Sequence, residues 1–485
     1  MKTGRVLIGP LLGVVLLVLA ACASDDRREQ VSGEAVSAFS DAFTVAGMPV
    51  TTGPNGLRSG TTGPDLDIRG GTGDQIDELM AAALADLDTY WKEAFEPAFG
   101  QSFKTGLSFV SWDAEASESL SESFCGQSTF RQVNAAFCPD RVEIGWDRGV
   151  LMPALLEEFG PMAPVTVIAH EYGHYIQMIG GFDKSASPIV SEQQADCLSG
   201  TFIRWLAEGH GKYLEINTGD GLNTAIAALI SARDGRRGQS DHGTAFERAD
   251  AFETGFSSGA AFCGAIGQLY VDGKRDQMPP RFDNTGSIDS SPFSEAGLES
   301  VVTSVESFFD LSEAVRPVVE RTALDGSCAD VDLAEVAQAP VAFCPSTNTV
   351  SMDPDQLALI ATNGTNGTNG PAGLPSFIGG DFSAYSLVAS RYSVAAQSAR
   401  GQVIDEPVTA ARAACDTGRW ARSAADSGAF TLRGGDLDEL VSGLLVSGAV
   451  ASDVAGRALP SGFARIDAFT AGYFDPENGC SRYDP

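Results

Sequence analysis

The sequence predicts an α+β protein, mainly helical, in which a second domain is a degenerate repeat of the first. Apolar residues recur at helical spacing from Asp74 to about Phe95. The run Val165–Gln177 carries two histidines four residues apart, which on a helix lie one turn apart and close enough to bind one metal ion. From this run onward, the second half of the chain echoes the first at an offset near 217 to 220 residues. The chain of 485 residues is long enough for two such domains.

The composition is that of a folded, strongly acidic protein. Hydrophobic residues make up 43% of the chain and charged residues 20%, which is an ordinary globular balance. Acidic residues number 64 against 32 basic ones, for a formal charge of -32. Such a charge repels the phosphate backbone, so we expect no nucleic-acid partner.

The N-terminus has the pattern of an export signal. Lys2 and Arg5 precede a single apolar stretch, Val6–Ala21, that is too short and too terminal for a polytopic membrane protein. The residues before Cys22 resemble a bacterial lipobox, in which the cysteine is acylated and becomes the new N-terminus. We therefore expect a signal peptide over 1–21 and a lipid anchor at Cys22 that tethers the protein to a membrane of the cell envelope. An ordinary secreted protein and an uncleaved anchor are the alternatives.

Changes in composition divide the rest of the chain. Residues 22–73 are rich in Ser, Gly, Thr and Asp, and predict a flexible stalk. The first domain is expected over 74–275. A polar stretch with Pro and Gly predicts a linker over 276–295, and the repeat follows over 296–485.

The chemistry is concentrated in the H-E-x-x-H motif formed by His170, Glu171 and His174. Two histidines one helical turn apart can bind one metal ion, and the glutamate beside the first can take a proton from an activated water. The alternative is a polar stripe on a buried helix. However, two of the four histidines in the chain lie in this otherwise apolar run, where unpaired burial would be costly. The motif predicts a Zn²⁺ site.

A catalytic zinc site needs a third protein ligand. The best source is the segment after the motif, in which Glu192 and Asp196 again lie one turn apart. We assign Glu192 to the metal and Asp196 to the ring N–H of a zinc-binding histidine. Two solvated acids on a helix face are the alternative in a chain this acidic.

Together these segments resemble the bacterial neutral zinc metallopeptidase family, in which an HEYGH-type helix is followed by an E-x-Q-A-D-C segment. The resemblance covers about residues 74–265. It implies a zincin-like fold, peptide or protein substrates, three zinc ligands (His170, His174 and Glu192) and Glu171 as the general base. It extends to His242 and Arg248, which resemble a His-Gly-Ser/Thr and Arg segment of the family.

The internal repeat separates site residues from fold residues. In the second half, all five candidate residues of the zinc site are replaced, by Ser390, Arg391, Val394, Ala410 and Ala414. Residues kept in both halves are interpreted as fold residues; they include Tyr172, Gln177 and Arg248. The second half is therefore expected to be a pseudopeptidase domain that packs on the first.

His242 is also lost from the second half, where Leu459 takes its place. It could donate a hydrogen bond to the oxyanion of the reaction. A capping or surface histidine is an equally good interpretation.

Eight cysteines remain once Cys22 is set aside, an even number that suits an oxidising compartment. The repeat predicts four disulfides, each within one half: Cys125 to Cys138, Cys197 to Cys263, Cys328 to Cys344, and Cys415 to Cys480.

These features predict a membrane-anchored, extracytoplasmic zinc metallopeptidase that hydrolyses peptide bonds with a zinc-activated water. The alternative function is a non-catalytic lipoprotein of the envelope that retains a metal and serves as a binding or scaffold protein. Glu171 favours catalysis, because a structural zinc would need the histidines but not the base.

Overall fold

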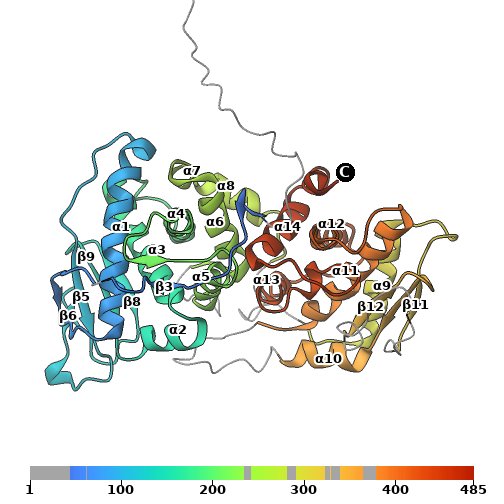
Figure 1. Ribbon diagram of the computed structural model, residues 1–485, viewed down its shortest axis with the longest axis horizontal. Helices are drawn as coiled ribbons and strands as arrows, with labels where there is room; N and C mark the ends of the chain where they lie inside the picture. Colours follow the sequence, from blue (N-terminus) through green and yellow to red (C-terminus); the bar gives the residue numbers. More distant parts are fainter. Residues whose placement is uncertain are drawn as a thin grey trace, which may run out of the picture. The chain divides into compact units, whose positions relative to one another are not determined.

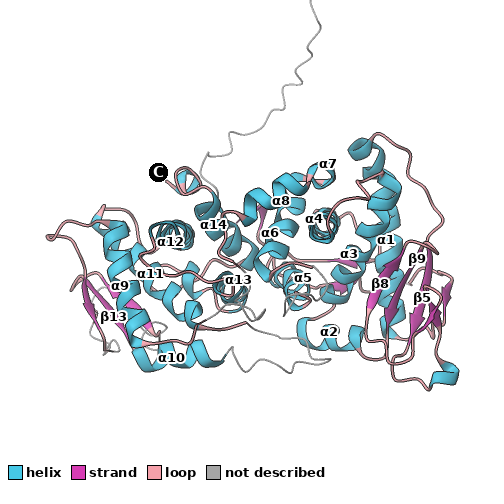
Figure 2. Cartoon of the chain, turned by 180° about the vertical axis from the view of Figure 1, so that it is seen from behind, coloured by secondary structure: helices cyan, strands magenta, loops and turns pink. Residues whose placement is uncertain are grey.

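The computed structural model describes residues 44–61, 63–233, 242–280, 291–322, 328, 339–363 and 378–484. All of them belong to one compact unit that spans Phe39–Pro485. The expected signal peptide and Cys22 lie outside the described residues. The described chain is mainly helical with several small sheets, which confirms that part of the predicted fold class (Figures 1 and 2).

The first helix of the first half is the long helix α1 (Gln75–Phe99), as the apolar spacing predicts. The side chain of Asp74 accepts hydrogen bonds from the backbone N–H groups of Ile76 and Asp77 and so caps the start of the helix. The helix ends at Gly100, whose φ of 67° favours glycine.

The main sheet of the first half has four strands in the order β4 (Ile68–Arg69), β5 (Ser108–Trp112), β9 (Glu143–Asp147) and β8 (Ala135–Cys138). The first three strands are parallel, and β8 pairs antiparallel with β9 at the edge. Between β5 and β8 lie a short helical turn, Glu118–Leu120, and the hairpin β6 (Ser123–Phe124) and β7 (Gln127–Ser128).

Seven more helices lie in the described part of the first half: α2 (Leu151–Phe159), α3 (Met162–Gly180), α4 (Pro188–Ala207), α5 (Asp220–Ser231), α6 (Ala245–Ser258), α7 (Ala260–Ala265) and α8 (Gln268–Arg275). Two glycines let α4 and α6 pack with their backbones in contact. A Cβ atom on Gly200 would lie 2.2 Å from the carbonyl oxygen of Phe252, and one on Gly255 would lie 1.8 Å from that of Cys197. These positions therefore need glycine.

The predicted stalk is wrong for its described part, because residues 44–61 and 63–73 are built into the first half. They contain β1 (Thr44–Val45), β2 (Met48–Pro49), β3 (Gly56–Leu57) and β4. Strand β3 pairs with β10 (Leu214–Glu215), and β4 joins the main sheet. Short polar side chains here bond to distant backbone: Asn55, for example, accepts a 2.8 Å hydrogen bond from the N–H of Asn217. A composition typical of a linker can therefore also serve as an ordered strap.

The second half repeats the order of these elements. Its strands are β11 (Val318–Glu320), β12 (Val341–Cys344) and β13 (Thr349–Met352), and its helices are α9 (Glu295–Phe309), α10 (Pro354–Asn363), α11 (Asp381–Ala399), α12 (Pro407–Ser427), α13 (Asp436–Val446) and α14 (Gly462–Phe474). Strand β13 pairs parallel with β11 and antiparallel with β12, as β9 does with β5 and β8. The close helix packing is repeated too. Cβ atoms on Gly418 and Gly472 would lie 2.2 and 2.0 Å from the carbonyl oxygens of Phe469 and Cys415.

The four predicted disulfides are confirmed, with the pairing that the repeat implies. One long bridge, Cys197 to Cys263, joins α4 to α7. Its counterpart, Cys415 to Cys480, joins α12 to the segment after α14. On the loop-entropy model, bridges that close loops of about 66 residues contribute roughly 4 kcal/mol each.

The two halves meet through α5 and α6 on one side and α13 and α14 on the other (Figure 1). The rings of Phe246 and Tyr473 lie 5.8 Å apart, and those of Phe256 and Phe463 lie 4.9 Å apart. The repeat relates Phe246 to Phe463 and Phe256 to Tyr473, so each contact is the counterpart of the other. This reciprocity is the signature of a two-fold interface, here between two halves of one chain.

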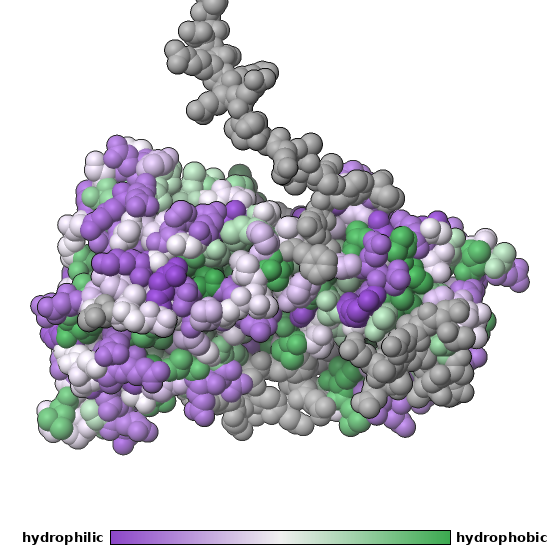
Figure 3. All heavy atoms as spheres, in the orientation of Figure 1, coloured by the Kyte–Doolittle hydropathy of each residue, from purple (hydrophilic) through white to green (hydrophobic). Residues whose placement is uncertain are grey.

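No helix in the described part of the chain is long and apolar enough to span a membrane. On the face drawn in Figure 3, hydrophilic and hydrophobic residues are interspersed. Exposed large apolar side chains are likewise spread over both halves, as at Leu120, Leu269 and Val446.

Candidate metal centre

Helix α3 carries His170 and His174 on one face, with their ring centroids 4.8 Å apart. The glycine between them, Gly173, allows α4 to approach this face. A Cβ atom on Gly173 would lie 3.1 Å from both the Cα and the carbonyl oxygen of Ala195. Close approach at this point brings the α4 side chains on either side of Ala195 to the two histidines.

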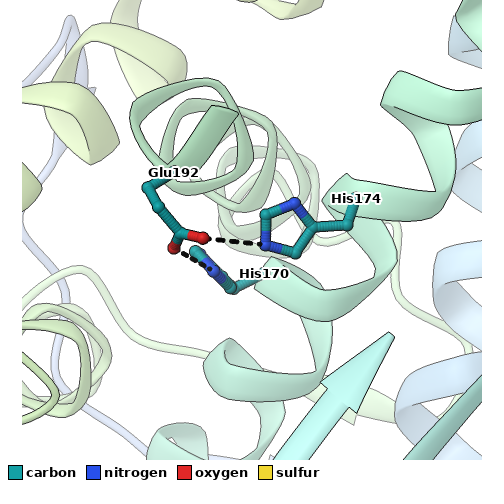
Figure 4. A group of neighbouring side chains, drawn as sticks. All are labelled: His170, His174 and Glu192. Carbon is teal, nitrogen blue, oxygen red and sulfur yellow. Dashed lines mark ion pairs between the residues drawn. The ribbon is translucent and has the colours of Figure 1, made fainter. Parts of the chain in front are cut away.

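The carboxylate of Glu192, on α4, faces a ring nitrogen of both histidines (Figure 4). Its Oε2 is 3.2 Å from Nε2 of His170, and its Oε1 is 3.5 Å from Nε2 of His174. One ligand atom from each of the three residues lies within 4.8 Å of the other two. Oε2 of Glu192 is buried and has no hydrogen-bond partner. The three side chains therefore present two ring nitrogens and an unsatisfied carboxylate oxygen to one point.

Asp196 and Arg248 hold His170 from the far side of its ring. Oδ1 of Asp196 lies 2.7 Å from Nδ1 of His170. Arg248, on α6, donates to both carboxylate oxygens of Asp196, from Nε at 2.9 Å and from Nη2 at 2.7 Å. Because Nδ1 faces a carboxylate, it carries the ring proton, and Nε2 is left as the atom that can bind a metal.

Gln177 plays a similar part for His174. Its Oε1 lies 2.9 Å from Nδ1 of His174, and its Nε2 donates to the carbonyl oxygen of Ser191 at 2.6 Å. Because the second half keeps Gln177 and Arg248, the internal repeat indicates that both are fold residues. The structure shows that each also supports a histidine. In the sequence, one feature pointed to such a role, and only for Arg248: its place in the segment that resembles the His-Gly-Ser/Thr and Arg segment of the family.

Glu171 faces the other side of the site and contacts the sheet. Its carboxylate accepts a 2.9 Å hydrogen bond from the backbone N–H of Phe137, on the edge strand β8. It also lines a cavity of about 210 Å³ together with His170 and Arg248. Most other lining residues are apolar, among them Val133, Leu151, Leu155, Val167, Ala228 and Leu229.

His242 lies near the three converging residues, just before α6. Its Nε2 is 3.9 Å from Oε2 of Glu192, its side chain is 36% exposed, and it lines the same cavity. Two residues later, Thr244 caps the start of α6 and forms a capping box with Glu247. His210 is elsewhere: its ring stacks on Trp205 at 5.8 Å.

The electrostatics of the site favour positive charge between the carboxylates. Burial alone would lower the pKa of His170, but Asp196 and Glu192 raise it to about 10. Burial would raise the pKa of Glu192, yet His170 and His174 hold it well below its usual range. Burial likewise opposes the charge of Asp196, and the adjacent Arg248 outweighs it and lowers the pKa.

In the second half, the residues that correspond to the metal centre are buried and form other contacts. The hydroxyl of Ser390 donates to the carbonyl oxygen of Val450 at 2.6 Å. Arg391, which replaces the glutamate of the motif, donates to the carbonyl oxygens of Ser452 and Asp453 at 2.5 and 2.6 Å. The other replacements, Val394, Ala410 and Ala414, are buried and apolar. These five positions offer no donor set for a transition metal.

No protein-family model matches the chain, and no solved structure matches it. Three uncharacterized mycobacterial proteins do match, one from Mycobacterium bovis and two from different strains of Mycobacterium tuberculosis. Each is 28% identical to this chain, over 28% of this chain and 55% of the relative. The chain thus spans about half the length of these relatives, and their names assign no activity.

Proposed function

We propose that the chain is a zinc-dependent peptide hydrolase with a zincin-like first domain, related to the bacterial neutral zinc metallopeptidases. The observation that carries the proposal is the convergence of two histidine Nε2 atoms with an unsatisfied, buried oxygen of Glu192. Two imidazoles and one carboxylate are a donor set that suits catalytic zinc and leaves one position open. Glu171, beside this donor set but outside it, supplies the base that a purely structural zinc would not need.

When bound, Zn²⁺ supplies Lewis-acid polarisation of a carbonyl and of a water molecule. The protein supplies the rest of the chemistry. Glu171, oriented by the N–H of Phe137, takes a proton from the water and passes it to the leaving amine. Asp196 and Arg248 keep His170 in the tautomer whose Nε2 is free. His242 donates to the oxyanion that develops on the substrate.

Two features favour a peptide over a small-molecule substrate. Strand β8 is the edge of its sheet and touches Glu171 through Phe137, so an extended peptide that pairs with this edge would pass the base. The cavity of about 210 Å³ beside Glu171 is mostly apolar and could take one side chain of such a peptide.

The second half, in this proposal, is a pseudopeptidase domain. Arg391 occupies the position of the base, and its bonds to Ser452 and Asp453 close the region that corresponds to the substrate site. We also propose an extracytoplasmic, membrane-tethered location through Cys22, which the four disulfides support. A non-catalytic, metal-retaining scaffold lipoprotein is the second candidate, favoured by the loss of the site from this half.

Peptide hydrolysis separates the two candidates. The mature chain from Cys22 should cleave members of a broad quenched-fluorescent peptide library, lose that activity to a chelator and regain it with zinc. Glu171→Gln should keep the zinc and lose activity by a factor of at least about 10². A wild-type protein that holds zinc but cleaves no peptide, or one in which Glu171→Gln is fully active, would contradict the proposal.

A further inference from the structure

Three buried carboxylates meet in the second half, at the start of α11. Asp381 is the first residue of α11, and Asp436 and Glu439 lie one turn apart on α13. One ligand atom from each lies within 4.8 Å of the other two. Their exposed fractions are 5%, 1% and 3%. Among the described residues, the only other group of this kind is the His170, His174 and Glu192 set.

Part of this cluster has an ordinary structural role. Oε2 of Glu439 accepts a 2.9 Å hydrogen bond from the backbone N–H of Phe382, and Oδ2 of Asp436 accepts one of 2.8 Å from that of Arg433. Gly380 makes room for the glutamate: a Cβ atom there would lie 1.9 Å from Oε1 of Glu439. These contacts fix two of the carboxylates in place.

They do not satisfy the cluster. Oδ1 of Asp381 and Oδ1 of Asp436 are buried and have no hydrogen-bond partner. A buried carboxylate oxygen without a partner is costly, and the helix-capping contacts leave both of these oxygens unpaired. Unpaired buried oxygens in two residues of one cluster favour a positively charged ligand there.

Burial also opposes negative charge on all three carboxylates. Burial raises the pKa of Asp381 to about 6 and that of Glu439 to about 8. Burial also raises the pKa of Asp436 well above its ordinary value, and Glu439 and Asp381 raise it further. Arg433 opposes these shifts only in part. Without a cation, the three carboxylates would therefore share protons near neutral pH.

We propose that Asp381, Asp436 and Glu439 bind a calcium ion. Calcium is bound by oxygen atoms at about 2.3 to 2.6 Å, so two oxygens on opposite sides of one ion lie up to about 5 Å apart. One oxygen from each of the three residues lies within 4.8 Å of the other two, so a single ion can reach all three. The three residues offer only oxygen donors, which suit a hard cation. The zinc proposed for the first half is instead bound by histidine nitrogens as well. Magnesium demands shorter bonds and a stricter octahedron.

The position of the site gives it a structural consequence. It joins the start of α11 to the start of α13, and α13 also carries Asp438, which bonds to the first half. Calcium would therefore stabilise α13, one of the two helices through which the second half contacts the first. This inference is independent of peptide hydrolysis, because none of its residues belongs to the zinc site.

Calcium binding to the zinc-loaded mature chain tests the proposal. At pH 7.5, titration calorimetry should find one site with a Kd of about 10⁻⁴ to 10⁻³ M, the range of extracellular calcium modules. Calcium at 5 mM, about five or more times that Kd, should raise the Tm measurably, and magnesium at the same concentration should raise it less. Asp436→Asn, which keeps the shape of the side chain, should abolish both responses to calcium. Asp355→Asn, at an exposed acid of α10, is the matched control and should respond like the wild type.

Two results would overturn the proposal. One is a wild-type Tm that calcium leaves unchanged, together with a higher Tm for Asp436→Asn, because the cluster would then share protons. The other is an equal calcium response in Asp436→Asn and the wild type, because the ion would then bind elsewhere on this acidic protein. If Asp436→Asn does not fold, Asp381→Asn serves for the same comparison.

Discussion

Asp438, on α13 in the second half, accepts a 3.0 Å hydrogen bond from the backbone N–H of Phe246 in the first turn of α6. The reverse contact also exists: Asn223 of α5 accepts a 2.7 Å hydrogen bond from the N–H of Gly462, at the start of α14. Each half therefore caps an equivalent helix of the other. Arg248, two residues beyond Phe246, holds Asp196 and through it His170. The degenerate half thus anchors the helix that supports the candidate metal centre.

Loss of this cap should destabilise the whole chain. Asp438→Ala leaves a buried N–H without its acceptor, which costs about 1 to 3 kcal/mol. Asp438→Asn keeps an acceptor oxygen and should lose less. Urea denaturation of the zinc-loaded protein measures both, with Asn223→Ala as the matched change at the reciprocal cap. Equal stability of Asp438→Ala and the wild type would show that the two halves do not depend on this contact.

Arg248 should differ in its effects from its repeat partner, Arg465. Arg248 pairs with the buried carboxylate of Asp196, whereas Arg465 donates to backbone carbonyls, at Leu459 and Leu444. Arg248→Met strands a buried charge and should cost about 3 kcal/mol or more. It should also weaken zinc binding, because it frees Asp196 from its place beside His170. Arg465→Met should lower stability alone. A competition assay with a zinc chelator measures zinc affinity, and denaturation measures stability. Equal zinc affinity in Arg248→Met and Arg465→Met would contradict the supporting role of Arg248.

Substitution of a zinc ligand should lower the affinity for zinc more than substitution of a group that supports a ligand. Glu192→Ala removes a ligand and should weaken zinc binding most. Asp196→Asn alters only the group that orients His170 and should weaken it by a factor of about 10 to 100. Glu171→Gln, outside the donor set, is the control and should keep wild-type affinity. The same chelator competition measures all three. If Asp196→Asn lost the metal and Glu192→Ala kept it, the two assignments would be reversed.

The acid cluster should make stability depend on pH when calcium is absent. Because burial raises the pKa of Asp381 to about 6 and of Glu439 to about 8, the folded chain holds protons there that the unfolded chain releases near pH 4. Stability from this cluster is therefore present at low pH and lost as the pH rises from about 4 through 8. Two neighbouring charged groups also shift these pKa values: Arg433 lowers that of Asp381, and Asp438 raises that of Glu439.

Denaturation in urea at pH 5, 6, 7 and 8 measures this effect as the difference between the wild type and Asp436→Asn. The wild type should lose stability relative to the variant as the pH rises, and saturating calcium should remove the loss. A difference that stays constant over this range would contradict the expected titration.

The sequence could predict what depends on spacing along one helix or on the internal repeat. The placement of His170 and His174 follows from a four-residue interval, and the four disulfides follow from matched cysteines. The convergence of Glu192 also depends on Gly173, whose close approach to Ala195 is a tertiary contact. No spacing rule gives that contact.

Other features could not be predicted, for identifiable reasons. The segment before Asp74 has the composition of a stalk, but partners far along the chain, such as Asn217, hold it in place. Because the second half keeps Gln177, comparison of the halves indicates only a fold residue. Its contact with His174 gives it a second role. The cluster of Asp381, Asp436 and Glu439 joins two helices and follows no motif in the chain.

The zinc content of the purified full-length mature chain tests the central claim most directly. After exposure to excess zinc and removal of loosely bound metal, the wild type should retain about one equivalent per chain, and His174→Ala should retain almost none, because loss of one of three protein ligands opens the site. Retention of no zinc by the wild type, or of equal zinc by the wild type and His174→Ala, would contradict the proposed metal centre.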